Sequence, residues 1–178
     1  WLRGPMTGLV DLLAAVPSLI YGMWGFFFLQ PKLVGISRWL AEHANVVPLF
    51  DTQGERYPSS ALIAGVVVAL MVVPIVTSVV RQVFSQTPAG EKEAALALGG
   101  SRWGMIRTVV LPFGRGGIIG GSMLGLGRAL GETIAVVIII SPVFEIDYRI
   151  LEQGANSIAA HIVTSFGEAS DLGLSALI

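Results

Sequence analysis

An uninterrupted run without any charged side chain, from residue 61 to residue 80, is the feature that most constrains how this chain folds. Its sequence is ALIAGVVVALMVVPIVTSVV. A transmembrane α-helix needs about 20 mostly apolar residues to cross the hydrocarbon core of a bilayer. Only 13% of the 178 residues are charged, whereas soluble domains carry about 25%. The two observations together predict a membrane-spanning helical protein.

Two further stretches are long enough to span a bilayer. Residues 12–29 contain no charge, and residues 118–140 contain only Arg128 and Glu132. A fourth span is expected to begin near residue 172. The predicted fold class is therefore all-α, a polytopic helical membrane protein.

The ends of the chain suggest that it is a fragment. It begins at Trp1 rather than at methionine, and it stops at Ile178 inside an apolar run. We therefore expect residues 1–178 to form one transmembrane domain that belongs to a longer polypeptide.

Two prolines lie inside the expected spans, Pro17 in the first and Pro74 in the second. Membrane helices tolerate proline because neighbouring groups satisfy the carbonyl that the ring leaves free. We therefore expect both helices to continue through their prolines as kinked helices.

Composition excludes several classes of function. Eleven basic and twelve acidic residues leave a net charge of −1, so binding of nucleic acid through a basic patch is excluded. The absence of cysteine excludes a disulfide scaffold and thiolate-ligated metal. His43 and His161 are isolated from other ligands, and we expect no metal site.

Basic residues indicate the orientation. The segment 81–115 contains five of the eleven, against two acids, whereas the three basic residues of 30–60 are balanced by three acids. The positive-inside rule places 81–115 in the cytoplasm and 30–60 in an outer loop.

The cytoplasmic segment has the signals of a helical hairpin. Thr87 is expected to cap a helix that has Pro88 at its first position and runs over 88–98. Gly99-Gly100 is expected to end that helix.

A second short helix is expected after this glycine pair. Ser101 is suited to cap it, and we expect it to run to about Val110 and to end at Pro112. The first helix places Ala94, Ala95 and Leu98 on one face. This small apolar face is suited to docking in a groove of another protein.

The hairpin resembles the EAA loop of ABC importer permeases. The match consists of Glu93-Ala94-Ala95-x3-Gly99, nine residues, and then Val109-x-Leu111-Pro112. In that family the loop forms coupling helices that sit in a cleft of the ATPase subunit. The resemblance implies that Glu93, Ala94, Ala95 and Gly99 dock there, together with Leu98 of the apolar face. The alternative is an ordinary cytoplasmic hairpin.

The third span contains one arginine and one acid. A charge at the centre of a membrane helix costs about 2.5–3.5 kcal/mol, and such residues are functional by default. Glu132 follows Arg128 at i+4, which would place both on one helix face. We expect this face to line the path of an anion, because the planar guanidinium presents several donors to an oxyanion. A structural ion pair is the alternative.

A ladder of glycines precedes this pair. Gly117, Gly121 and Gly125 recur at four-residue spacing, which would allow another helix to pack closely. The chain contains no Gly-x4-Gly-Lys-Ser/Thr loop, and we therefore expect no nucleotide site or other cofactor in it.

Two longer passages resemble the phosphate ABC-transporter permeases of the PstC type. They are GLGRALGETIAV over residues 125–136 and DLLAAVPSLIYGMWG over residues 11–25. In that family the arginine and the acid that match Arg128 and Glu132 are implicated in phosphate passage. The resemblance implies a type I ABC importer permease in the bacterial plasma (inner) membrane.

The same resemblance implies several partners. They are a pair of ATP-binding subunits that carry ATP-Mg, a second permease of the PstA type, an extracytoplasmic phosphate-binding protein and the lipid bilayer. The chain itself would not be an enzyme. The alternatives are a permease for another oxyanion such as sulfate, an intramembrane enzyme, and a channel.

Overall fold

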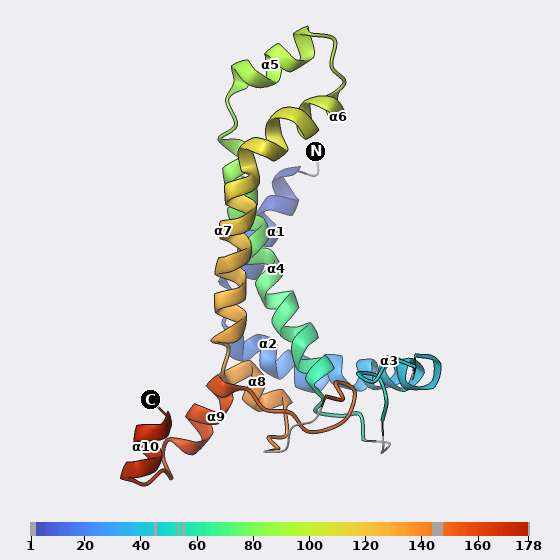
Figure 1. The fold of residues 1–178 in the computed structure, drawn as a ribbon, viewed down its shortest axis with the longest axis vertical. Coiled ribbons are helices and arrows are strands. Elements are labelled where there is room, and N and C mark those ends of the chain that lie inside the picture. Colours follow the sequence, from blue (N-terminus) through green and yellow to red (C-terminus); the bar gives the residue numbers. More distant parts are fainter. Residues whose placement is uncertain (1–2, 45, 53, 55, 144–147, 178) are drawn as a thin grey trace. The chain divides into compact units, whose positions relative to one another are not determined.

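The computed structural model describes residues 3–44, 46–52, 54, 56–143 and 148–177. These residues are mostly helical and include no β-strand. Three helical stretches are long and apolar enough to cross a membrane, namely Ser18–His43, Ala61–Ser85 and Arg102–Leu130 (Figure 1). The expected all-α membrane-protein fold is therefore confirmed.

The chain divides into two compact units, each of which combines distant parts of the sequence. We call α1 (Arg3–Ala15) together with residues 72–128 the hairpin unit. Residues 16–71 and the described part of 129–178 form the short-helix unit.

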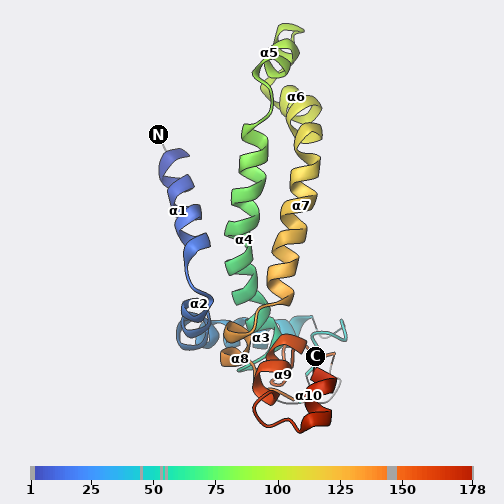
Figure 2. The same cartoon turned by 90° about the vertical axis from the view of Figure 1, so that its left-hand side faces the viewer.

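The hairpin unit consists of two long helices joined by a helical hairpin. Besides α1 it contains most of α4 (Ala61–Ser85), α5 (Ala89–Ala97), α6 (Arg102–Met105), the π-helical turn η2 (Ile106–Val110) and nearly all of α7 (Leu111–Leu130). In this unit α4 and α7 run side by side, and α5 and α6 lie beyond their ends (Figures 1 and 2). The expected span 61–80 lies within α4, which continues through Pro74.

The short-helix unit has its own apolar core. Its helices are α2 (Ser18–Trp24), the π-helical turn η1 (Gly25–Leu29), α3 (Gln30–His43), the first part of α4, α8 (Ile134–Ile139), α9 (Ile158–Ser165) and α10 (Asp171–Leu177). Ile63, Ala64 and Val67 of α4 are buried against Ile139 of α8. Glycine makes the close packing possible here, because a Cβ at Gly22 would lie 2.8 Å from the Cα of Ala135.

The expectation of one helix over 12–29 is wrong. α1 ends at Ala15 and α2 begins at Ser18, with Pro17 in an extended conformation between them (φ −59°, ψ 141°). Proline lacks an N–H and disfavours the α conformation of the residue before it. The carbonyl of Pro17 accepts the N–H of Ile20 instead (3.0 Å), which begins the new helix.

The boundary of the expected outer loop also differs. Helical structure continues from α2 through η1 into α3, so the first half of 30–60 is helical to His43. The expected start of a span near residue 172 coincides with α10, a helix of 7 residues.

Candidate functional site

The hairpin of α5 and α6 has a well-defined glycine elbow. The N–H of Gly99 donates to the carbonyl of Leu96 (3.0 Å), and the N–H of Gly100 donates to that of Ala95 (3.2 Å). This pair of bonds is the Schellman motif. Gly99 has φ +82°, and a Cβ on Gly100 would lie 2.5 Å from the Ala95 oxygen. Gly99 is required by its positive φ, and Gly100 by the lack of room for a Cβ. The expected end of the helix at this glycine pair is confirmed.

The start of α5 differs by one residue from the expectation. The N-cap is Pro88, not Thr87, and it makes no side-chain capping bond. The hydroxyl of Thr87 instead donates to the carbonyl of Phe84 (2.9 Å) at the end of α4. Thr87 thus closes the preceding helix, because its side chain is turned back to the last turn of α4.

The second helix begins as expected and ends elsewhere. The hydroxyl of Ser101 accepts the N–H of Gly104 (3.1 Å), which confirms the predicted cap. The expected end at Pro112 is wrong, since the helix runs on to Leu130. The π-helical turn η2 explains this result: Leu111 donates to Ile106, five residues back, and the wider turn gives the proline ring room that an α-turn lacks.

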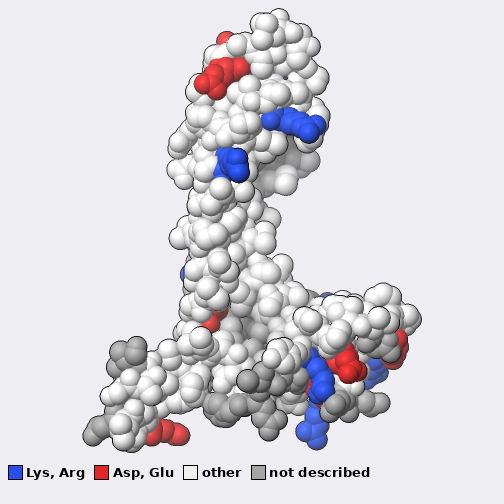
Figure 3. All heavy atoms as spheres, in the orientation of Figure 1, with Lys and Arg blue, Asp and Glu red and all other residues white. Residues whose placement is uncertain are grey.

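The residues expected to dock are accessible on this hairpin. Glu93, Ala94, Leu98 and Gly99 are exposed, and Ala95 is partly buried. Leu98 is 89% exposed. Figure 3 shows separate acidic and basic patches over the end of the molecule that carries α5 and α6.

Trp103 of α6 is a further exposed apolar side chain of this hairpin, and the sequence pattern did not single it out. It is 68% exposed, and α5 and α6 contact each other. An indole in a charged segment directly after a helix cap was the available signal. We call Leu98 and Trp103, with Glu93, Ala94 and Ala95, the hairpin surface.

Arg128 and Glu132 do not share a helix face. α7 ends at Leu130, and residues 131–133 interrupt the helix before α8 begins at Ile134. The expectation of one helix over 118–140 is therefore wrong. Gly131 stands at the break, and the Thr133 hydroxyl donates to the Gly131 carbonyl (3.0 Å).

The two side chains have different surroundings. Arg128 is exposed near the end of α7, and its guanidinium forms no hydrogen bond or ion pair with any described residue. Glu132 is only 7% exposed, and its carboxylate accepts the N–H of Ala135 (3.3 Å) in the first turn of α8. Glu132, which precedes the N-cap Thr133, thus accepts a backbone N–H at the start of α8, whereas Arg128 is unpaired among the described residues.

The glycine ladder of α7 lies against valines of α4. A Cβ on Gly117 would lie 2.5–2.6 Å from carbon atoms of Val83, and one on Gly121 would lie 3.2 Å from Val80. Gly125 lies against Val76 and Val72, and a Cβ on it would lie 2.8 Å from Val72. The close approach of α7 to α4 therefore depends on these positions being glycine, which has no side chain.

An ion pair between α1 and α4 was not anticipated. The carboxylate of Asp11 accepts hydrogen bonds from the Arg81 guanidinium (2.7 Å) and from the Ser78 hydroxyl (3.0 Å). The sequence signal was weak, because each charge stands at the edge of an apolar run and the two lie seventy positions apart. In the part of the chain that the structure describes, no group of three potential metal ligands comes together.

Comparison with known proteins relates this chain to transport systems. A family model described as "Binding-protein-dependent transport system inner membrane component" matches residues 1–166. The chain is 45% identical over 172 residues to "Phosphate transport system permease protein PstC 2" of Mycobacterium tuberculosis, which covers 96% of this chain and 53% of that protein.

Two further relatives have similar coverage. "Phosphate transport system permease protein PstC" of Xylella fastidiosa is 44% identical over 181 residues, covering 100% of this chain and 56% of the relative. The protein of the same name from Pasteurella multocida is 41% identical, with 100% and 56% covered. The chain thus spans about half the length of these relatives, all of which are named as permeases.

Proposed function

This chain belongs to the family of binding-protein-dependent transport system inner membrane components, and we propose on that basis that it is the membrane-spanning subunit of an ATP-driven phosphate importer. The names of the relatives, which are phosphate transport permeases, support the choice of substrate. Sulfate is the alternative oxyanion.

The observation that carries the proposal is the exposed hairpin surface. Leu98 is 89% exposed and Trp103 68% exposed, although burying one such side chain contributes about 1.5–3 kcal/mol. A protein that leaves both uncovered at the tip of a rigid hairpin is suited to insert them into a partner. We propose that this partner is the cytoplasmic ATPase pair, which carries ATP-Mg, and that the hairpin transmits its closure to α4 and α7.

Docking is tested by Leu98→Asp and Glu93→Lys in the full-length subunit. Losing the leucine that the partner would cover should weaken ATPase association about tenfold to hundredfold. Glu168→Lys, an exposed acid in the short-helix unit, is the matched control and should not change association. Copurification and a titration of the ATPase onto the reconstituted permease measure the effect. Normal association of both hairpin variants would refute the docking surface.

The substrate path is proposed to include Arg128 and Glu132. The guanidinium of Arg128 is exposed and unpaired among the described residues, and it offers donors to an oxyanion at any physiological pH. Arg128→Met should abolish phosphate uptake without preventing assembly, and Arg128→Lys should retain part of the uptake. Uptake by Arg128→Met at the normal rate would exclude this role.

The remaining subunits follow from the same proposal. A second permease of the PstA type would complete the pore, and an extracytoplasmic binding protein would deliver phosphate to the outer loops. The protein would lie in the inner membrane of a bacterium, with residues 81–115 on the cytoplasmic side. Substrate-dependent ATPase stimulation in liposomes, with phosphate set against sulfate, tests the substrate. A larger response to sulfate would overturn the assignment to phosphate.

A further inference from the structure

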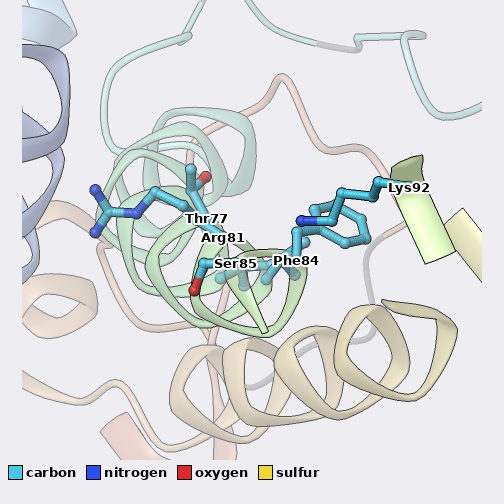
Figure 4. A pocket seen from close by; sticks show the side chains of 7 residues that line it. Thr77, Arg81, Phe84, Ser85 and Lys92 are labelled. Carbon is cyan, nitrogen blue, oxygen red and sulfur yellow. The ribbon is translucent and has the colours of Figure 1, made fainter. Parts of the chain in front are cut away.

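An open groove of about 560 Å³ lies along the last turns of α4, below α5. Its apolar side is formed by Val76, Val80 and Phe84, half-buried side chains that also pack against glycines of α7. Polar groups stand around it: Thr77, Arg81, Ser85 and, from α5, Lys92 (Figure 4). All of these residues belong to the hairpin unit, so the groove is built within one compact unit.

The two cations of the groove are not equivalent. The Arg81 guanidinium turns toward α1 (Figure 4), where Asp11 holds it. The ammonium of Lys92 extends over the groove toward the side of Phe84 (Figure 4). It forms no hydrogen bond or ion pair with any residue that the structure describes. The groove therefore presents an apolar side and one available positive charge.

The position of the groove along α4 matches a membrane boundary. The charge-free run 61–80 is long enough to cross the hydrocarbon core, and Arg81 is the first charged residue after it. Residues 76–85 extend over roughly 14 Å of helix. With residues 61–80 placed in the hydrocarbon core, the end of the groove at Val76 would lie beside acyl chains and the end with Lys92 at the level of the lipid headgroups.

We propose that this groove binds an anionic phospholipid of the cytoplasmic leaflet. One acyl chain would lie along Val76, Val80 and Phe84, and the headgroup phosphate would meet Lys92. Basic pockets at the cytoplasmic ends of transmembrane helices are suited to such headgroups. Inorganic phosphate alone fits less well, because it would lose its water against an apolar side while meeting a single unpaired cation.

A lipid in this groove would affect how the hairpin is connected to α4. Lys92 belongs to α5 and lies one residue before Glu93 of the hairpin surface. A bound lipid would therefore connect α5 to the end of α4. This inference rests on the proposed cytoplasmic orientation of the hairpin and not on the choice of phosphate as the transported substrate.

The test uses the full-length subunit in its assembled transporter. Native mass spectrometry in detergent would count bound phosphatidylglycerol against phosphatidylcholine, without ATP. Lys92→Gln should weaken phosphatidylglycerol binding about fivefold, the effect of roughly 1 kcal/mol per cation near a membrane surface. Arg107→Gln removes a cation of the same hairpin that does not line the groove, and it should leave binding unchanged.

A second variant tests the apolar side of the groove. Thr77 is exposed and lines the groove, so Thr77→Trp should fill it and reduce phosphatidylglycerol binding while Lys92 stays in place. The thermal midpoints of all variants would be compared with that of the wild type to show that each is folded. Because lipid is counted directly, failure of the phosphate assignment would not affect the result.

Three outcomes would overturn the proposal. Unchanged lipid binding by Lys92→Gln would mean that another protein segment or subunit covers the groove. An effect of Lys92→Gln without one of Thr77→Trp would indicate a diffuse surface charge rather than a groove. Release of the lipid by millimolar inorganic phosphate, but not by chloride at equal ionic strength, would indicate a site for the free anion.

Discussion

Replacing Gly117 by alanine is expected to destabilise the packing of α7 against α4. The new Cβ would lie 2.5–2.6 Å from three carbon atoms of Val83, whereas ordinary contacts begin at 3.4 Å. The two half-buried helix faces would have to separate locally by about 0.9 Å to relieve this contact. Such overpacking costs about 1–3 kcal/mol.

The neighbouring glycine supplies the control. A Cβ on Gly116 would meet nothing within 4 Å, so Gly116→Ala adds the same methyl group without a clash. Alanine also favours the helix over glycine by up to about 1 kcal/mol in water. Both variants gain the same helix propensity, so they should differ by the overpacking cost alone, about 1–3 kcal/mol in the free energy of unfolding, with Gly116→Ala the more stable.

The assay is equilibrium unfolding of the full-length subunit in mild detergent. A compensating change sharpens it: Val83→Gly combined with Gly117→Ala moves the small residue to the other helix and should restore most of the lost stability. Equal stabilities of the two single variants would refute the close approach of α4 and α7. Failure of the double variant to recover would show that Val83 is not the contact.

Three further effects are expected. Gly100→Ala should lower the free energy of unfolding by about 1–3 kcal/mol and weaken ATPase association, because its Cβ would lie 2.5 Å from the Ala95 oxygen. Thermal unfolding and copurification measure these two effects. A thermal midpoint equal to that of the wild type would contradict the prediction. Asp11→Asn should destabilise only slightly, since both side chains of the ion pair with Arg81 are over a third exposed and screened by solvent. In the same unfolding assay, the double variant Asp11→Asn with Arg81→Gln should be little less stable than Asp11→Asn alone. If the effects of the two single substitutions simply add, the two side chains are not coupled. Glu132→Ala should cost about 1 kcal/mol by removing the acceptor at the start of α8, whereas Glu132→Gln keeps an acceptor and should retain stability; equal losses would exclude this role.

The hairpin shows how far local sequence signals reach. The glycine pair at 99–100 and the cap at Ser101 act through neighbouring backbone groups, with bonds that span only a few residues. Such features are encoded locally, and their prediction needed no knowledge of distant segments. The same holds for the apolar run 61–80, which became one helix despite Pro74.

The two breaks within predicted spans could not be predicted from local sequence signals. Pro17 ended a helix whereas Pro74 and Pro112 did not, although each lies in apolar sequence. At Pro112 the preceding turn is π-helical, and the N–H of Leu111 donates to the carbonyl of Ile106 there. At residues 131–133, burial of Glu132 and its bond to the start of α8 accompany the break.

The sequence by itself determined the class of the protein: a helical membrane protein with a helical hairpin that bends at a glycine pair. Charge distribution and short-range backbone chemistry suffice for that conclusion. Only the tertiary structure decided that Asp11 pairs with Arg81 and that the α7 glycines face valines of α4. It also decided that Glu132 lies in a break after α7, whereas Arg128 lies within α7. The physical reason is that these relations depend on which surfaces pack together, and periodicity shows that a face is apolar without showing its partner.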